Sequence, residues 1–129
     1  MQATDAVLTT YFRERIAAHM AGKATLAPLK YMAFGDGGHD PKTMEPLSPS
    51  ENQTALNHEV LRKELNTVTQ EDTLSVTGTG EIKADELVGT FLSEAALVDA
   101  DGKLIGLKFF APKIKEGDEQ YDIVVKVRF

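Results

Sequence analysis

Three side chains with metal-binding chemistry lie in one short stretch of the chain, at Asp36, His39 and Asp40. Two carboxylates and an imidazole are ligands that a divalent metal ion accepts, and such a site would serve a metal-dependent hydrolase. Metal ligands usually come from separate rigid elements, however, whereas these three share a glycine-rich segment followed by proline. Because aspartate and glycine are also the residues that tight turns require, the pattern favours a turn over a metal site.

The glycines of the same stretch raise the question of a phosphate-binding loop. A P-loop needs Lys followed by Ser or Thr, and a dinucleotide fingerprint needs glycines at fixed spacing that open a helix. Neither pattern is present. We therefore predict a structural turn over Gly35, Asp36, Gly37 and Gly38, because glycine allows positive φ and a sharp reversal of the chain.

Two other combinations of ionisable residues resemble acid–base catalysts. His58 precedes Glu59, as a general base and its orienting group would, and Glu94 with Asp99 resembles a carboxylate pair. A histidine often falls beside a carboxylate by chance, and a turn beginning at Asp99 accounts for that residue. We expect structural roles for all four residues, and hence no catalytic residue, no cofactor and no enzyme activity.

The composition restricts the class of protein. The chain has 129 residues, 42% hydrophobic and 26% charged, which is typical of one folded domain, so we expect a single domain over residues 1–129. It contains no cysteine, which excludes thiolate chemistry and disulfides. No apolar run is long enough to cross a bilayer and no signal peptide is apparent, so we expect no membrane insertion.

The charge of the chain is acidic overall and uneven along its length. A net charge of −6 argues against binding to nucleic acid, because phosphate neutralisation requires clustered Lys and Arg. Residues 36–59 carry five acids against one base, residues 81–101 carry six acids against one base, and residues 103–129 carry six bases against four acids. Oppositely charged faces would favour contacts with copies or partners, but a mixed, solvated surface is the favoured interpretation.

The elements that must position these residues begin with a predicted amphipathic helix over residues 5–21. Thr4 or Asp5 would cap its start, and Gly22 suits its end. An apolar residue recurs at every fourth position and forms one stripe for packing on a sheet: Leu8, Phe12, Ile16 and Met20.

The remainder of the chain is dominated by strand patterns and turn signals. Two turns are predicted, at Thr77-Gly78-Thr79-Gly80 and, as a hairpin, at Asp101-Gly102. Residues 39–50 contain three prolines and predict an irregular loop. The strands are expected at Leu29–Phe34, at the antiparallel pair Val60–Thr69 and Thr73–Thr79, and at Gly89–Val98, Leu104–Phe110 and Tyr121–Phe129. The resulting fold class is α+β, with the N-terminal helix packed on a mostly antiparallel sheet or sandwich of about five to seven strands.

Four features, taken in their order along the chain, carry a family resemblance. They are the opening helix, the strand from Leu29 that runs into the glycine-rich turn, the segment Leu56–Arg62, and the run from Glu94 through Asp101-Gly102 to Gly106. In this order the chain resembles the N-terminal domain of phage tail-collar fibre proteins, the part that attaches a tail fibre to the baseplate. The resemblance spans nearly the whole sequence.

The resemblance implies a structural protein of a virion tail or of a phage-derived tail-like particle, synthesised in the bacterial cytoplasm. It implies phage tail or baseplate proteins as partners, together with self-association as an oligomer, often a trimer. It implies no catalysis.

Two other functions remain open. A small-ligand or carbohydrate-binding β domain would need a concave pocket, for which Tyr31, Phe34 and Tyr121 are candidate lining residues. The metal-dependent hydrolase based on Asp36, His39 and Asp40 is the third hypothesis.

Overall fold

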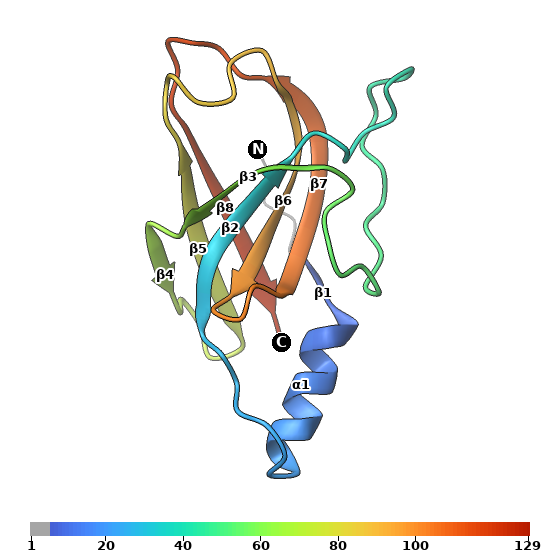
Figure 1. Cartoon of the computed structure of the whole chain (residues 1–129), viewed down its shortest axis with the longest axis vertical. Coiled ribbons are helices and arrows are strands. Elements are labelled where there is room, and N and C mark those ends of the chain that lie inside the picture. The colour runs from blue at the N-terminus through green and yellow to red at the C-terminus, as the bar shows by residue number, and fades with distance from the viewer. Residues whose placement is uncertain (1–5) are drawn as a thin grey trace.

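Two antiparallel β-sheets face each other in the computed structural model of the chain, which describes residues 6–129 (Figure 1). The described part contains one short helix, α1, at Thr10–Met20. It contains eight strands: β1 Val7–Leu8, β2 Leu29–Gly35, β3 Glu59–Glu64, β4 Thr67–Thr69, β5 Ser75–Ile82, β6 Phe91–Asp99, β7 Leu104–Ile114 and β8 Tyr121–Arg128. The predicted antiparallel α+β class is confirmed in outline, with one strand more than the expected range and a smaller helix.

The larger sheet has the strand order β1-β7-β6-β2-β3, and β6 lies at its centre. All residues of β6 after Phe91 are buried. Its neighbours are β7, joined to it by the predicted hairpin turn, and β2, which returns from a distant part of the chain. A strand packed on both faces suits the small side chains of Ala95 and Ala96, which lie in the two different core clusters.

The smaller sheet has the order β4-β5-β8, and its main contact is the continuous pairing of β5 with β8 from Ser75↔Arg128 to Ile82↔Tyr121. The prediction of one strand over Val60–Thr69 was wrong. That segment divides into β3, which pairs with β2, and β4, which pairs with β5. The chain crosses between the sheets where Leu65 N–H donates to Lys30 O and Asn66 N–H donates to Thr79 O.

The turn predicted at residues 77–80 was also wrong, because these residues lie inside β5. Its two glycines face the opposite sheet at close range. A Cβ on Gly78 would lie 2.6 Å from Leu97 Cδ2, and a Cβ on Gly80 would lie 2.6 Å from Met32 Sδ. The glycines therefore make room for large side chains of the facing sheet, which is a packing role that a turn signal in the sequence does not distinguish.

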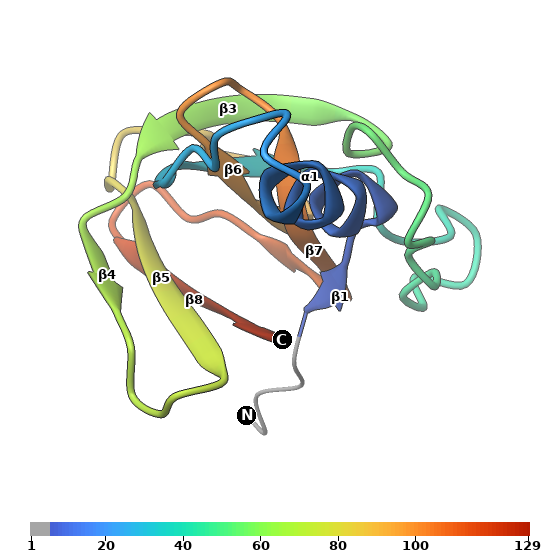
Figure 2. The same ribbon diagram turned by 90° about the horizontal axis from the view of Figure 1, so that it is seen from below.

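The main core lies between the two sheets, as the end-on view in Figure 2 shows. Alternate residues of the strands on both sides point inward, which produces the expected layered packing. The buried members of this cluster are Ala6, Met32, Phe34, Ile82, Leu92, Ala95, Leu97, Val125 and Val127.

A second cluster lies on the outer face of the larger sheet, where the long loop of residues 36–58 supplies the buried Leu56. The other buried members come from the sheet itself: Ala33, Ala96, Val98, Leu104 and Leu107. The loop contains no helix, as predicted for residues 39–50, but it packs against the sheet instead of simply crossing the surface.

Helix α1 is shorter than predicted and starts later. The capping residues proposed for it, Thr4 and Asp5, lie outside the described residues. Its N-cap is Thr9, whose side chain accepts a hydrogen bond from Phe12 N–H, while Gly22 has a φ of +74° just beyond its end, as expected. Residues before Thr9 are withdrawn from the helix because Val7 pairs with Leu107 and Ala6 N–H donates to Lys126 O.

The helix does not lie over the sheet with a buried stripe. None of its residues is buried, and Met20 at its end is 79% exposed. It projects from one end of the sandwich (Figure 1), held by a ring contact of 5.3 Å between Phe12 and Phe129 and by Tyr11 Oη, 3.5 Å from Asp99. No helix within residues 6–129 is long and apolar enough to span a bilayer.

Candidate functional site

The three residues considered as metal ligands do not converge. Asp36 Oδ1 lies 2.5 Å from His58 Nδ1, whereas His39 Nδ1 lies 2.8 Å from Ser93 Oγ. The side chain of Asp40 accepts the N–H of Lys42 inside its own loop. Among residues 6–129, no group of three or more His, Asp or Glu side chains is placed to hold a metal ion.

The glycines of this stretch are needed for close approach of the backbone. None of Gly35, Gly37 and Gly38 has a positive φ. A Cβ on Gly35 would instead collide with the backbone of His58, and a Cβ on Gly38 with Ser93 O. These glycines allow the start of the long loop to lie directly against its own end and against β6.

Glu94 is the buried acid at the centre of this region. Its side chain is completely inaccessible, and Oε1 accepts the N–H of His58 at 2.9 Å. Oε2 has no hydrogen-bond partner among the residues that the structure describes. Burial raises the pKa of the Glu94 carboxyl above its ordinary value, while the N–H of His58 acts in the opposite direction. The carboxyl group therefore anchors the end of the loop to the sheet.

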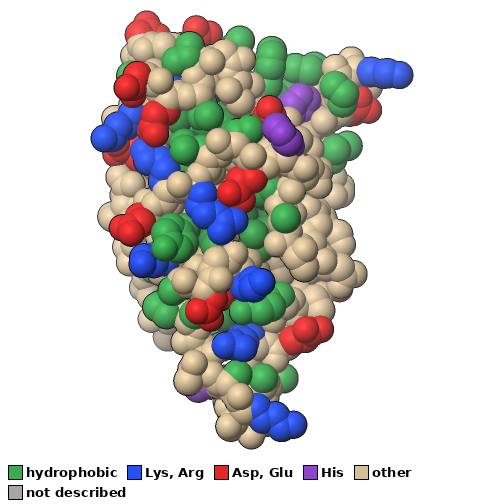
Figure 3. All heavy atoms as spheres, viewed as in Figure 1, with side chains coloured by type: hydrophobic (Ala, Val, Ile, Leu, Met, Phe, Trp, Pro, Cys, Tyr) green, Lys and Arg blue, Asp and Glu red, His purple; other side chains and the backbone are tan. Residues whose placement is uncertain are grey.

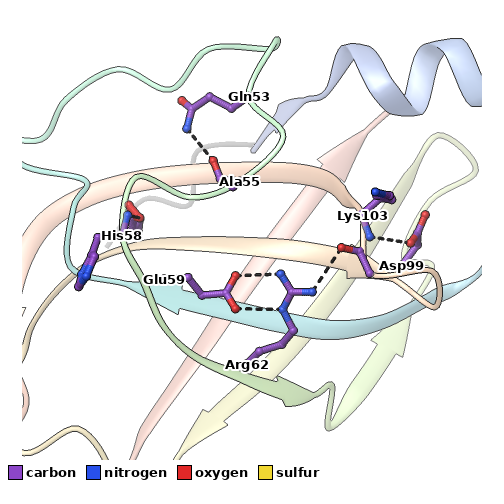
Figure 4. A network of polar contacts seen from close by, with 9 residues as sticks. Gln53, Ala55, His58, Glu59, Arg62, Asp99 and Lys103 are labelled. Atoms are coloured by element: carbon purple, nitrogen blue, oxygen red, sulfur yellow. Dashed lines mark hydrogen bonds and ion pairs between the residues drawn. The ribbon is translucent and has the colours of Figure 1, made fainter.

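The two acid–base pairs considered from sequence are not formed. Glu59 makes two hydrogen bonds with Arg62, at 2.8 and 3.1 Å, and does not orient His58 (Figure 4). Asp99 lies at the far end of β6 from Glu94, and its Oδ1 accepts the N–H groups of Asp101 and Lys103. The predicted hairpin turn is confirmed, with Gly102 at a φ of +84°.

The end of the sandwich opposite α1 is where β6 begins and β7 ends (Figure 1). Three large apolar side chains are exposed at or next to these strand ends, and we call them the apolar end: Val88, Phe91 and Ile114. Their exposed fractions are 57%, 43% and 45%. Phe91 and Ile114 are direct partners in the pairing of β6 with β7, so the two rigid strands hold them side by side.

Polar and charged side chains are interspersed on the face shown in Figure 3, as the favoured interpretation of the charge pattern expected.

Lys115 fixes the loops of this end from inside. It is 1% exposed, and its Nζ donates to Ala84 O at 3.1 Å and to Glu116 O at 2.8 Å. The same ammonium lies 5.5 Å from the ring centroid of Tyr121, and the backbone N–H of Lys115 donates to Thr90 O. The apolar end is therefore preorganised.

A groove with a volume of about 710 Å³ lies between β7 and β8. Of the three aromatic residues expected to line a pocket, only Tyr121 does so. Phe34 is buried in the main core, and Tyr31 packs on the outer face of the larger sheet. The groove is lined by Leu92, Lys108, Phe110, Lys113, Glu119, Gln120, Tyr121, Asp122, Ile123 and Val124.

Sequence reasoning missed Ser93, Lys108 and Lys115. A lysine in or beside a strand is ordinarily expected to be exposed to solvent. Lys108 and Lys115 are buried because their ammonium groups hydrogen-bond to backbone carbonyls, which the sequence alone does not identify. Ser93 and Glu94 together interrupt the apolar run of β6, and this interruption was the available signal for Ser93.

Comparison with known proteins assigns the chain. A search of curated proteins gives no match. The model of one protein family, described as phage tail-collar fibre protein, N-terminal, matches residues 1–124. The match covers nearly all of the sequence, including the larger sheet, the long loop, the apolar end and the smaller sheet as far as residue 124 in β8. It supports a structural role in a phage tail and interaction with other tail proteins. The chain belongs to the phage tail-collar fibre protein family and corresponds to its N-terminal domain.

Proposed function

We propose that this domain attaches a tail fibre to the baseplate of a phage or phage-derived tail-like particle, and that it works as an oligomer. In this function the protein supplies rigid surfaces for assembly and carries out no chemical reaction. The family supports the location in the tail, and the contact surfaces of the fold support the attachment role.

The observation that carries the proposal is the apolar end. Phe91 and Ile114 are exposed at the ends of paired strands, and Val88 is exposed in the turn that precedes β6. An assembly contact gains most from such preorganised apolar surface. Lys115 holds the two loops of this end through carbonyl hydrogen bonds, so little conformational entropy is lost on docking. An aromatic residue in such a place is the usual anchor of a protein interface.

The test is binding of the purified chain to separately purified baseplate and tail proteins of the same particle. We expect Phe91→Ser to weaken binding by about 30-fold, the loss typical of an aromatic interface anchor. Leu74→Ser is the matched control, because Leu74 is 60% exposed and precedes β5. Equal binding by both variants, or no binding of any tail component by the wild type, would contradict the proposal.

A further inference from the structure

The groove between β7 and β8 contains a buried cation. Lys108 is 8% exposed, and its Nζ donates one hydrogen bond, to Val124 O at 2.9 Å. An ammonium group has three N–H donors, and within residues 6–129 Lys108 has no ion pair. Burial alone lowers its pKa, with no acidic neighbour acting against it. The groove therefore presents a desolvated positive charge that a carboxylate would neutralise.

The surroundings of Lys108 define what else an occupant needs. Leu92, Phe110 and Ile123 supply apolar lining, which suits a flexible apolar side chain. Glu119 and Asp122 also line the groove and are exposed, so a cation on the occupant would find a counter-charge there. The fitting occupant is a segment that presents an apolar side chain next to a carboxylate, with a base close by.

The chain itself exposes such a segment at residues 42–45, which we call the loop tip. Lys42, Met44 and Glu45 are all exposed, and Met44 retains 39% of its accessible surface. The loop that carries them stands away from the body of the molecule, at the upper right of Figure 1 in teal. It thus offers the apolar side chain, the carboxylate and the base together.

The loop tip is held in one conformation by its own backbone. Met44 N–H donates to Asp40 O at 2.7 Å, and Asp40 N–H donates to Glu45 O at 2.9 Å. Met44 has a φ of +62°, a left-handed conformation that is costly for a residue with a side chain. A strained but well-bonded tip that exposes methionine is expected where the side chain has a partner.

We propose that the groove of one copy receives the loop tip of a second copy, with Met44 on the apolar lining and Glu45 paired with Lys108. Lys42 would then face Glu119 and Asp122. The contact is heterologous, since a different surface is used on each copy, and such contacts build closed rings when the rotation closes. The inference rests on the proposed function in one respect, because it names the surfaces that form the oligomer.

The experiment measures molar mass against concentration by light scattering for the full chain and its variants. We expect the wild type to associate, and Glu45→Lys to lower the association constant by about 30-fold or more, as expected for breaking a buried charge pair. Glu71→Lys makes the same charge change at an exposed residue of the connection between β4 and β5, and should associate as the wild type does. A strictly monomeric wild type, or unchanged association of Glu45→Lys, overturns the proposal.

Mixing two defective variants tests the head-to-tail geometry. Lys108→Met fills the groove without its charge, so it should fail to associate alone while retaining an intact loop tip. Mixed with Glu45→Lys, it should give a 1:1 dimer that grows no further, because only one good tip and one good groove remain. Larger assemblies, or no dimer from two folded variants, would contradict the proposal. If Lys108→Met does not fold, the comparison of Glu45→Lys with Glu71→Lys still decides.

A small carboxylate is the alternative occupant, and sodium octanoate serves as its probe. If octanoate raises the melting temperature of the wild type while Glu45→Lys still associates normally, the groove is a ligand site and the proposal fails. The outcome is separable from that of the proposed function. If the loop tip binds the groove but the chain binds no baseplate protein, only the attachment role is contradicted. If the chain binds a baseplate protein but Glu45→Lys associates as the wild type does, only this inference is contradicted.

Discussion

The backbone N–H of His58 donates a 2.9 Å hydrogen bond to the carboxyl group of Glu94, and this contact ties the end of the long loop to the central strand of the larger sheet. The loop begins at Asp36, whose side chain also contacts His58. Both ends of the loop therefore meet above one buried acid. The arrangement makes the position of the loop sensitive to the state of Glu94.

The first prediction concerns the pH dependence of stability. Burial places the folded-state pKa of Glu94 above its ordinary value of 4.5, so the folded chain binds this proton more tightly than the unfolded chain. The stabilisation is complete below pH 4.5 and is lost as pH rises through the folded-state pKa. We expect the free energy of unfolding of the wild type to fall relative to that of Glu94→Gln over this range, measured by urea denaturation.

The comparison with Glu94→Gln isolates this one group, because the variant retains an oxygen acceptor for His58 N–H and the remaining ionisable groups. Glu71→Gln makes the same substitution at an exposed position, and its free energy of unfolding should stay within about 0.5 kcal/mol of the wild type at pH 7. A difference between wild type and Glu94→Gln that stays constant from pH 4 to pH 8 would show that Glu94 does not titrate as proposed.

The second prediction concerns the close approach at Gly38. Its N–H donates to Ser93 Oγ at 2.9 Å, and a Cβ there would collide with Ser93 O. Because backbone cannot move aside as a flexible side chain can, Gly38→Ala should destabilise the fold by about 1–3 kcal/mol. Gly117→Ala is the matched control, since its Cβ would lie 3.7 Å from the nearest atom and its φ is not positive. We expect that variant to lie within about 1 kcal/mol of the wild type in thermal and urea denaturation.

Two elements of the fold could be predicted from the sequence. The turn at Asp101-Gly102 and the strand expected at Tyr121–Phe129 rest on local signals, namely the φ of one residue and the residue types within one strand. Both were predicted correctly. The turn closes the hairpin of β6 and β7, whereas the last strand pairs with β5 in the smaller sheet.

The failures concern features fixed by distant residues. Gly78 and Gly80 lie within a strand because Leu97 and Met32 of the facing sheet occupy the space above them. No pattern near residue 78 contains that information. Strands β3 and β4 were read as one for the same reason, since their separate partners β2 and β5 decide where the strand is interrupted.

The candidate surfaces were harder still to predict. The sequence drew attention to the glycine-rich stretch because Asp36, His39 and Asp40 could bind a metal ion. In the fold these three side chains have different partners and do not converge. Burial of Lys108 depends on Val124 O, and burial of Lys115 depends on Ala84 O and Glu116 O. The sequence around a lysine does not indicate which carbonyl groups will lie near its ammonium group, because their positions depend on the topology of the fold.

The third prediction tests Lys115 as the internal support of the apolar end. Replacing it by Met keeps the approximate volume but leaves two carbonyl groups, Ala84 O and Glu116 O, without their donor. We expect a loss of about 2–4 kcal/mol in the free energy of unfolding, because each hydrogen bond from a charged donor contributes about 1.5–3 kcal/mol. Lys113→Met, at an exposed position near the end of β7 and two residues before Lys115, should change stability by less than about 0.5 kcal/mol. Equal losses in the two variants would show that Lys115 contributes only as a surface charge.

The fourth prediction concerns the hairpin turn, which depends on Asp99 more than on the Asp101 that marks it in the sequence. Asp99 is 2% exposed, and its Oδ1 accepts both the Asp101 and the Lys103 N–H at 2.9 Å. Asp99→Ala removes both bonds and should destabilise the fold by about 1–3 kcal/mol in urea denaturation. Asp99→Asn retains an oxygen acceptor and should lose less of the free energy of unfolding.

Asp101 provides the control. It is exposed and forms a 3.9 Å ion pair with Arg15, so Asp101→Ala should stay within about 0.5 kcal/mol of the wild type. Similar losses from Asp99→Ala and Asp101→Ala would mean that the backbone of Gly102, at positive φ, holds the turn without help from the carboxylate.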